Sequence, residues 1–169
     1  QKKVVSLQRF MRKLCVFILI LLASAPLLAQ NEAKANDLFQ SANYTSALKE
    51  YGLLLRRYPS SALFAYRYAR CAQELGDYTT AIQYFKKSGN RYDLKHFNLG
   101  EIYLTLCYPE EAIASYEAYL ATQPSDSERI PYVRTQIHKA EKLQRYLRRV
   151  EKVNIIDSVE TTIDSILTY

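Results

Sequence analysis

The stretch YTSALKEY at residues 44–51 decides the fold, because related stretches recur as YTTAIQYF at 78–85 and YPEEAIASY at 108–116. Ala47 and Ala81 are 34 residues apart, and so are Tyr51 and Phe85. A 34-residue period is typical of helix–turn–helix units that stack into a continuous array. The next step, from Ala81 to Ala112, is only 31 residues. The second unit is therefore three residues short, in its second helix or in the loop that follows.

The repeated pattern predicts an all-α fold, a superhelix of three helical hairpins followed by a long capping helix and a short strand-like tail. Apolar residues recur on one face of each predicted helix. The repeat region should span residues 30–124, with its three units at 31–59, 61–90 and 93–124.

Two further segments follow the repeats. SDSE at 125–128 has the spacing of a capping box, and it opens a charged segment, 125–152, that should form the capping helix. A basic helix on a membrane surface is the alternative for this segment. Residues 153–169 begin with the β-branched run VNIIDSV and are expected to be strand-like, as the start of a missing domain.

The net charge of +6 comes mostly from the N-terminal segment. Without the five basic residues that precede the first apolar run, 18 basic residues face 17 acidic ones. A nearly neutral body offers no electrostatic footprint for nucleic acid, so we predict no nucleic-acid partner. Glycine (4) and proline (5) are scarce and tyrosine (15) is abundant, which favours packed helices over disorder.

The N-terminus has the pattern of an export signal. Met11 and two basic residues precede a short apolar run that ends in small residues near Ala29. This order is typical of a secretory signal peptide, expected at 11–29, with residues 1–10 as upstream read-through. The alternative is a retained membrane anchor, but the segment Leu14–Leu28 has 15 positions, fewer than the roughly 20 that span a bilayer.

The sequence offers little support for catalysis. His96 and His138 are far apart in sequence and lack metal-ligand neighbours, and no glycine-rich phosphate loop or nucleophile elbow is present. We therefore expect a protein that is not an enzyme and binds no metal or cofactor. Cys71 and Cys107 both fall in first-helix patterns and should be buried thiols, with a single disulfide as the alternative in an oxidising compartment.

Three sets of residues resemble the tetratricopeptide repeat family: Tyr44, Ala47, Tyr51 and Pro59; Tyr78, Ala81 and Phe85; and Leu99, Gly100, Tyr103, Ala112, Tyr116 and Pro124. The resemblance covers roughly residues 31–150. Gly100 should let the neighbouring helix approach closely, despite the cost of about 1 kcal/mol for a glycine within a helix. The sequence departs from the family at Ala35 and Ala69, where the third unit has Gly100, and in lacking a closing proline after the second unit.

In this family the first helix of each unit lines a concave groove, so the resemblance implies a protein or peptide partner held there. The expected partner-binding residues are Asn36, Phe39, Gln40, Tyr66, Arg70, Gln73, Phe97, Glu101 and Leu104. Glu32 and Glu74 also face this groove in the alignment. Glu32 takes a position where capture of a C-terminal carboxylate requires lysine, so this mode of binding is not expected.

Residues 150–159 are similar to the junction in bacterial envelope proteins where such repeats precede a WD-like β-propeller and sometimes an OmpA-like domain. The resemblance implies an exported scaffold, periplasmic or associated with the outer membrane. Association with outer membrane or peptidoglycan would run through a missing C-terminal region. The alternative is a structural docking module for that region.

Overall fold

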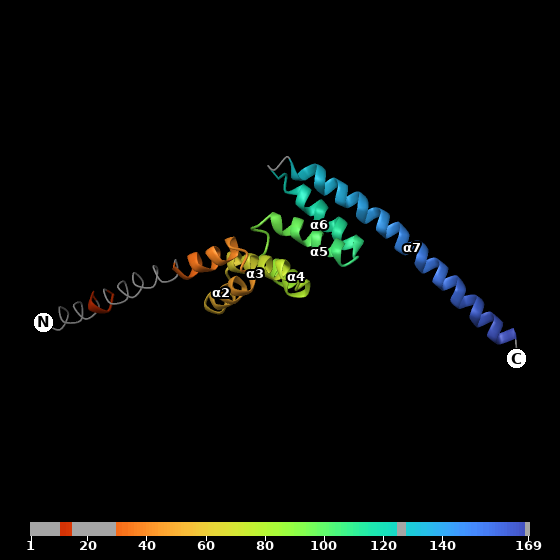
Figure 1. The fold of residues 1–169 in the computed structure, drawn as a ribbon, viewed down its shortest axis with the longest axis horizontal. Coiled ribbons are helices and arrows are strands. Elements are labelled where there is room, and N and C mark those ends of the chain that lie inside the picture. Colours follow the sequence, from red (N-terminus) through yellow and green to blue (C-terminus); the bar gives the residue numbers. More distant parts are fainter. Residues whose placement is uncertain (1–10, 15–29, 125–127, 168–169) are drawn as a thin grey trace. The chain divides into compact units, whose positions relative to one another are not determined.

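The computed structural model describes residues 11–14, 30–124 and 128–167, with side chains as far as residue 156. These residues form helices and turns, and none of them lies in a strand (Figure 1). Residues 30–40 are helical and precede α2 (Tyr44–Arg57). The later helices are α3 (Ala62–Glu74), α4 (Tyr78–Lys87), α5 (Leu94–Thr105), α6 (Pro109–Ala121) and α7 (Arg129–Leu167). The all-α prediction is confirmed.

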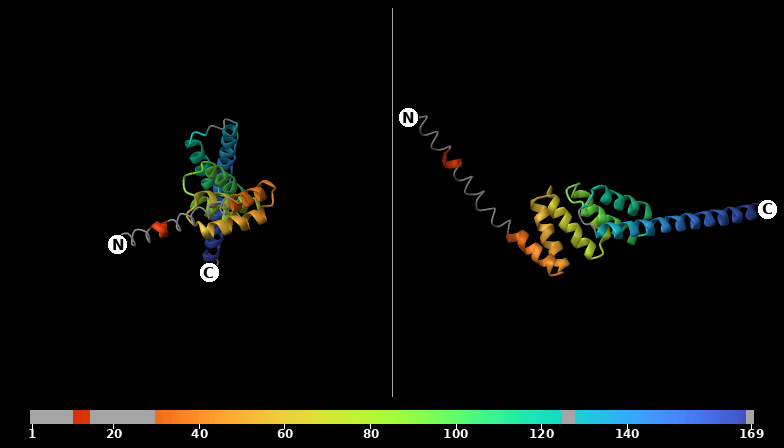
Figure 2. Two further views of the ribbon diagram at one scale, coloured as in Figure 1. Left: turned by 90° about the vertical axis from the view of Figure 1, so that its left-hand side faces the viewer. Right: turned by 90° about the horizontal axis from the view of Figure 1, so that it is seen from above.

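The chain divides into two compact units at Ser88 and Gly89. The first unit holds the helix at 30–40 and α2 to α4. The second holds α5 to α7, and Figure 2 shows α5 and α6 as a hairpin with the start of α7 alongside. Among the described residues, no helix is both long and apolar enough to cross a membrane.

Each hairpin turns through one residue with positive φ. These residues are Ala42, Gly76 and Cys107, at the same 34- and 31-residue spacing as the repeat. A left-handed residue commonly ends a helix because it lets the next amide reach back to the last carbonyls. Asn43 and Asp77 then cap the following helices, accepting from the backbone N–H of Ser46 and Thr80 at 3.2 and 3.1 Å.

The short second unit ends early in its second helix. α4 has 10 residues, whereas α2 has 14 and α6 has 13. After the chain leaves α4, Lys95 of α5 holds the loop, because its buried ammonium group donates to the carbonyl of Gly89 and to Asn90 Oδ1. Burial lowers the pKa of Lys95, although the nearby Asp93 carboxylate opposes the shift.

The predicted strand-like tail is wrong. α7 is one helix from Arg129 to Leu167, so it includes most of residues 153–169; the last two residues lie outside the described part. β-branched residues lose only a few tenths of a kcal/mol in a helix. α7 contains no glycine, and its one proline, Pro131, lies in the first turn, where the backbone N–H would have no partner within the helix. A helix also satisfies its backbone groups without the partner strand that an isolated strand would need.

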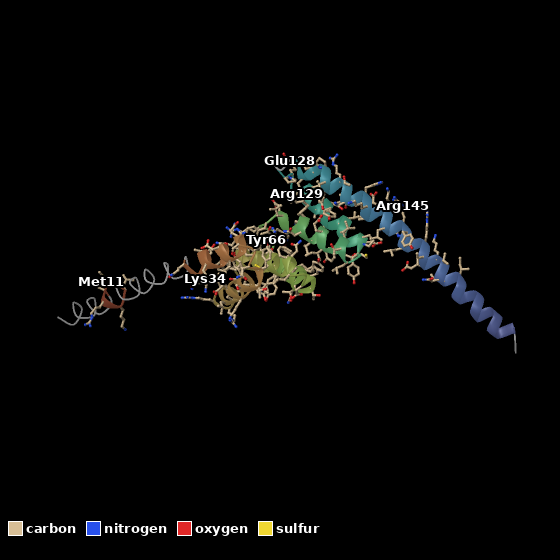
Figure 3. All side chains as sticks on the ribbon, viewed as in Figure 1. Met11, Lys34, Tyr66, Glu128, Arg129 and Arg145 are labelled. Carbon is tan, nitrogen blue, oxygen red and sulfur yellow. The ribbon has the colours of Figure 1, made fainter. Side chains whose placement is uncertain are left out.

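The N-terminal half of α7 behaves as the expected capping helix. Val133 and Ala140 are buried in a cluster with Ala112, Tyr116 and Tyr119. From Arg145 to residue 156, every described side chain is exposed. Arg145, labelled in Figure 3, lies near the end of the contact with α6, because Arg148 still reaches Glu110 of α6 at 3.9 Å. The capping box falls mostly on residues 125–127, and the signal peptide mostly on 15–29, both outside the described residues.

The two cysteines differ. Cys71 is fully buried in the core of the first unit, as predicted, but Cys107 is exposed, so that half of the prediction is wrong. The reason is the turn: Cys107 has φ 60° and follows the end of α5, where a side chain points away from the hairpin. Both thiols are free.

Gly100 and Gly52 provide a test of helix packing. A Cβ added to Gly100 would lie 2.6 Å from the Tyr116 ring, which is fully buried and has no room to move. We expect Gly100→Ala to lower the free energy of unfolding by about 1–3 kcal/mol through overpacking. At Gly52 the nearest atom would be 3.4 Å away, so Gly52→Ala should raise it by up to about 1 kcal/mol. Urea unfolding followed by circular dichroism measures both, and a Gly100→Ala variant as stable as wild type would contradict the close approach.

Thiol labelling tests the two cysteine environments. Burial raises the pKa of Cys71 to about 12, against the opposing effect of Arg70, so this thiol stays protonated at mildly alkaline pH. We expect iodoacetamide to label Cys107 rapidly in the native protein and Cys71 only after unfolding in guanidinium, with mass spectrometry as the readout. Equal native labelling rates would contradict the burial of Cys71.

Candidate functional site

One register position recurs in all three hairpins. The second helix places Tyr51, Phe85 or Tyr116 fully inside the hairpin, and each has no exposed surface. Fifteen residues earlier, the first helix carries Asn36, Arg70 or Glu101. In each hairpin, a buried ring of the second helix is thus paired with a polar side chain of the first helix that is one of the predicted partner-binding residues.

The outer hairpins use this pair as a hydrogen bond between helices. Tyr51 donates its hydroxyl to Asn36 Oδ1 at 2.6 Å, and Tyr116 donates to Glu101 Oε1 at 2.5 Å. Burial raises the pKa of Tyr51 to about 12. Burial and the bond to Glu101 also raise the pKa of Tyr116. Both hydroxyls therefore stay protonated as donors over the physiological range.

The middle hairpin differs because Phe85 has no hydroxyl. Arg70 therefore makes other contacts, with Phe39 and Tyr66. We call these three predicted residues, together with Gln73 three positions further along α3, the α3 surface. The Arg70 guanidinium lies 5.7 Å from the centre of the Phe39 ring, and that of Arg67 lies 5.9 Å from it. Tyr66, labelled in Figure 3, is buried and packs its ring 5.6 Å from Phe85.

Arg70 is partly satisfied. Its Nη2 contacts Glu74 Oε1 at 3.1 Å. Burial opposes the charge of the guanidinium, but hydrogen bonds to Tyr66 and Glu74 raise its pKa overall, so it stays charged. Two buried atoms of the α3 surface, Arg70 Nε and Gln73 Oε1, have no hydrogen-bond partner within the described part of the chain. An unpaired buried polar atom costs about 1–3 kcal/mol.

In the second unit, α7 covers two of the three predicted residues. Phe97 packs against Tyr132 of α7, with ring centres 6.0 Å apart, and the Arg129 guanidinium lies 5.1 Å from the centre of its ring (Arg129 is labelled in Figure 3). Glu101 accepts a second hydroxyl, from Tyr132, at 3.0 Å. Leu104 packs, partly buried, against the Tyr116 cluster.

The remaining predicted residues are more separate. Asn36 is engaged with Tyr51, and Gln40 is exposed at the end of the helix at 30–40. His96 is half-buried, consistent with a boundary role, and burial lowers its pKa, as does Lys95. No group of three or more histidine, cysteine, aspartate or glutamate residues in the described ranges could hold a metal ion.

Sequence reasoning missed Arg67 and Tyr132. Arg67 lies one position after Tyr66, outside the set that the family pattern assigns to the groove, and only the position of Phe39 shows its contact. Tyr132 lies on α7, beyond the repeats. For Arg67, a cation next to the assigned residue Tyr66 was the only signal in the sequence, and for Tyr132 there was none.

Comparisons with known proteins agree with this architecture. Family profiles described as tetratricopeptide repeat match residues 32–90 and 96–126. No curated protein sequence matches the chain. Among solved structures, the Yersinia enterocolitica chaperone SycD, in complex with a peptide of the translocator YopD, is similar with a TM-score of 0.63 and 19% identity. That match covers 69% of this chain and 94% of SycD.

Two other similar structures come from different settings. The TPR2B domain of yeast Sti1 in a complex with pHsp70 has a TM-score of 0.60 and 13% identity, over 68% of this chain and 96% of that chain. The first TPR of Spaghetti (RPAP3), bound to an HSP90 peptide, has a TM-score of 0.61 and 18% identity, over 70% of this chain and 93% of that one. At such identities the likeness shows the fold. Residues 32–90 and 96–126 of this chain are therefore tetratricopeptide repeats, built as helical hairpins.

Proposed function

We propose that this protein is a non-catalytic scaffold that binds an extended peptide or a partner helix through the first helices of its repeats. The observation that carries the proposal is the pair of unpaired buried atoms on the α3 surface, Arg70 Nε and Gln73 Oε1. Arg70 and Gln73 are three residues apart and share one helical face. One offers a donor and the other an acceptor, which is the complement of a peptide group.

The surroundings of this pair also suit a peptide. Phe39 is half-buried and supplies apolar area, while the guanidinium groups of Arg67 and Arg70 lie 5.9 and 5.7 Å from the centre of its ring. Recognition of an extended chain combines main-chain hydrogen bonds with pockets for alternate side chains. The similar structures of SycD, Sti1 and Spaghetti hold peptides, which supports the same class of partner here.

A C-terminal carboxylate is not the expected ligand. Asn36 Oδ1 already accepts the Tyr51 hydroxyl, and Glu32 adds a negative charge to the same helix. The carboxylate of Glu32 would repel the free C-terminus of a peptide at the position where a lysine would be needed to bind it. An internal peptide segment avoids this conflict.

We further propose that the protein acts in the bacterial envelope after export. The charged start and short apolar run at 11–29 support this location. N-terminal sequencing of the mature protein tests it, and recovery of Met11 would oppose cleavage.

A second candidate role is docking of a further domain, which the exposed apolar residues Val153, Ile155 and Ile156 on α7 favour; their exposed fractions are 55, 61 and 56%.

The α3 surface can be tested with peptides selected from a random display library on the full chain. We expect Arg70→Ala/Gln73→Ala to weaken binding of the selected peptides at least tenfold, or about 1.4 kcal/mol. The matched control is Arg57→Ala/Gln83→Ala, which removes the same groups from exposed positions on α2 and α4. Fluorescence anisotropy measures each affinity, after circular dichroism confirms folding.

Two outcomes would contradict the α3 surface. The first is an equal loss in the test and control variants, which would mean that binding depends on charge alone. The second is unchanged binding in Arg70→Ala/Gln73→Ala. Both variants keep Tyr66, because truncation of that buried ring would also open a cavity.

A further inference from the structure

A second concave site lies on the other side of α3 from Tyr66 and Arg70. Its volume is about 520 Å³, and it lies wholly within the first unit. We call it the α2–α4 groove; its lining residues are Thr45, Leu48, Lys49, Gly52, Leu55, Arg56, Tyr68, Tyr84 and Lys87. Tyr68 is two residues from both Tyr66 and Arg70, which places it about 200° around the helix from each. This groove is therefore distinct from the α3 surface.

The α2–α4 groove has an aromatic and apolar floor. Tyr68 and Tyr84 pack with ring centres 4.4 Å apart. Leu55 is buried and Leu48 is half-buried beside them. Gly52 has no side chain to fill the space in front of Tyr68. A glycine within a helix costs about 1 kcal/mol relative to alanine, so its presence in α2 keeps the groove open at a cost in stability.

The rim of the groove is basic. Lys49, Arg56 and Lys87 are exposed, and the Lys87 ammonium group lies 5.4 Å from the centre of the Tyr84 ring. None of the lining residues is acidic. Within the described part of the chain, none of these three cations forms an ion pair, whereas Lys34 pairs with Glu50. The groove therefore concentrates positive charge beside apolar surface.

The spacing of the cations selects among anionic ligands. Lys49 and Arg56 are seven residues apart on α2, so their Cα atoms are separated by about 10.5 Å along the helix. A single phosphate group needs donors that converge on one point. An extended chain advances about 3.3 Å per residue and places alternate side chains on opposite faces. Carboxylates on such a chain match the spread of the rim, while the intervening apolar side chains face the floor.

We propose that the α2–α4 groove binds an extended acidic segment of a partner protein, in which aspartate or glutamate alternates with aromatic or aliphatic residues. The carboxylates pair with Lys49, Arg56 and Lys87, and one apolar side chain enters the space over Gly52 against Tyr68 and Tyr84. The protein then has two separate docking sites in its first unit, one on each side of α3.

The probe is a fluorescein-labelled peptide of about eight residues in which glutamate alternates with leucine and phenylalanine, about 25 Å when extended. Its control peptide has glutamine in place of every glutamate. Fluorescence anisotropy with the full chain compares Arg56→Gln/Lys87→Gln with Arg57→Gln/Lys86→Gln. The second pair is adjacent in sequence, lies in the same last turns of α2 and α4, removes the same charge and does not line the groove.

We expect the acidic peptide to bind, and Arg56→Gln/Lys87→Gln to weaken it roughly fivefold or more, because two of three charge-assisted contacts are lost. The control pair should change affinity less than about twofold, and the glutamine peptide should bind much more weakly. Added salt should weaken binding to wild type, since exposed charges are screened. Arg70→Ala/Gln73→Ala should leave this binding unchanged, which separates the groove from the α3 surface.

Four results would overturn the proposal. They are failure of the acidic peptide to bind, equal loss in the two variant pairs, displacement of the peptide by inorganic phosphate at equal concentration, and tighter binding of an oligothymidylate to the same three cations. The second would mean general charge attraction. The third and fourth would assign the groove to a small anion or to single-stranded nucleic acid.

Discussion

The structure depends on one contact, a buried aromatic ring of the second helix set against a small residue of the first. Tyr51, Phe85 and Tyr116 hold this position, opposite Ala35, Ala69 and Gly100 in the register of the repeat. Full burial of such a ring contributes about 1.5–3 kcal/mol, which is a large share of what a short hairpin gains from packing. The small residue sets how closely the helices approach, and it is smallest where the Tyr116 ring leaves no space for a Cβ.

The same ring decides which polar side chains can reach a ligand. Where it carries a hydroxyl, it engages the residue one position after the small one, as Tyr51 engages Asn36 and Tyr116 engages Glu101. Phe85 makes no such bond, and Arg70 turns to Phe39, Tyr66 and Glu74 with its Nε unpaired. The hairpin that lacks the internal bond therefore keeps unpaired polar atoms, which are the atoms that the proposed peptide partner would engage.

Much of the fold could be predicted because the repeat depends on spacing. The recurring alanine and aromatic positions predict the helical hairpins, and Gly100 predicts a close approach of two helices, which its position against the Tyr116 ring confirms. The helical state of residues after 152 does not follow from their local β-propensity, because it depends on continuation of the helix that precedes them. The exposure of Cys107 does not follow from the repeat pattern, because it depends on the left-handed turn position that this cysteine occupies.

The candidate site could be predicted only as a set of positions. Asn36, Arg70 and Glu101 occupy the same position in the three repeats. Their hydrogen bonds and ion pairs differ, and these depend on side-chain geometry that the repeat does not determine. The cover that α7 places over Phe97 depends on contacts between segments distant in sequence. The sequence does not predict the α2–α4 groove, because its cations are separated along the chain by residues of positive and negative charge. Only the packing of Tyr68 and Tyr84 shows that Lys49, Arg56 and Lys87 border one space.

The most direct test of this account is the free energy of unfolding of Arg70→Asn compared with that of Arg70→Asn/Phe85→Tyr, measured by urea titration. The double variant recreates in the middle hairpin the pair that Tyr51 and Asn36 form in the first. We expect it to be more stable than the single variant by about 0.5–1.5 kcal/mol, the net value of one hydrogen bond. Equal or lower stability would contradict the claim that this register position sets the choice between an internal bond and a free polar group.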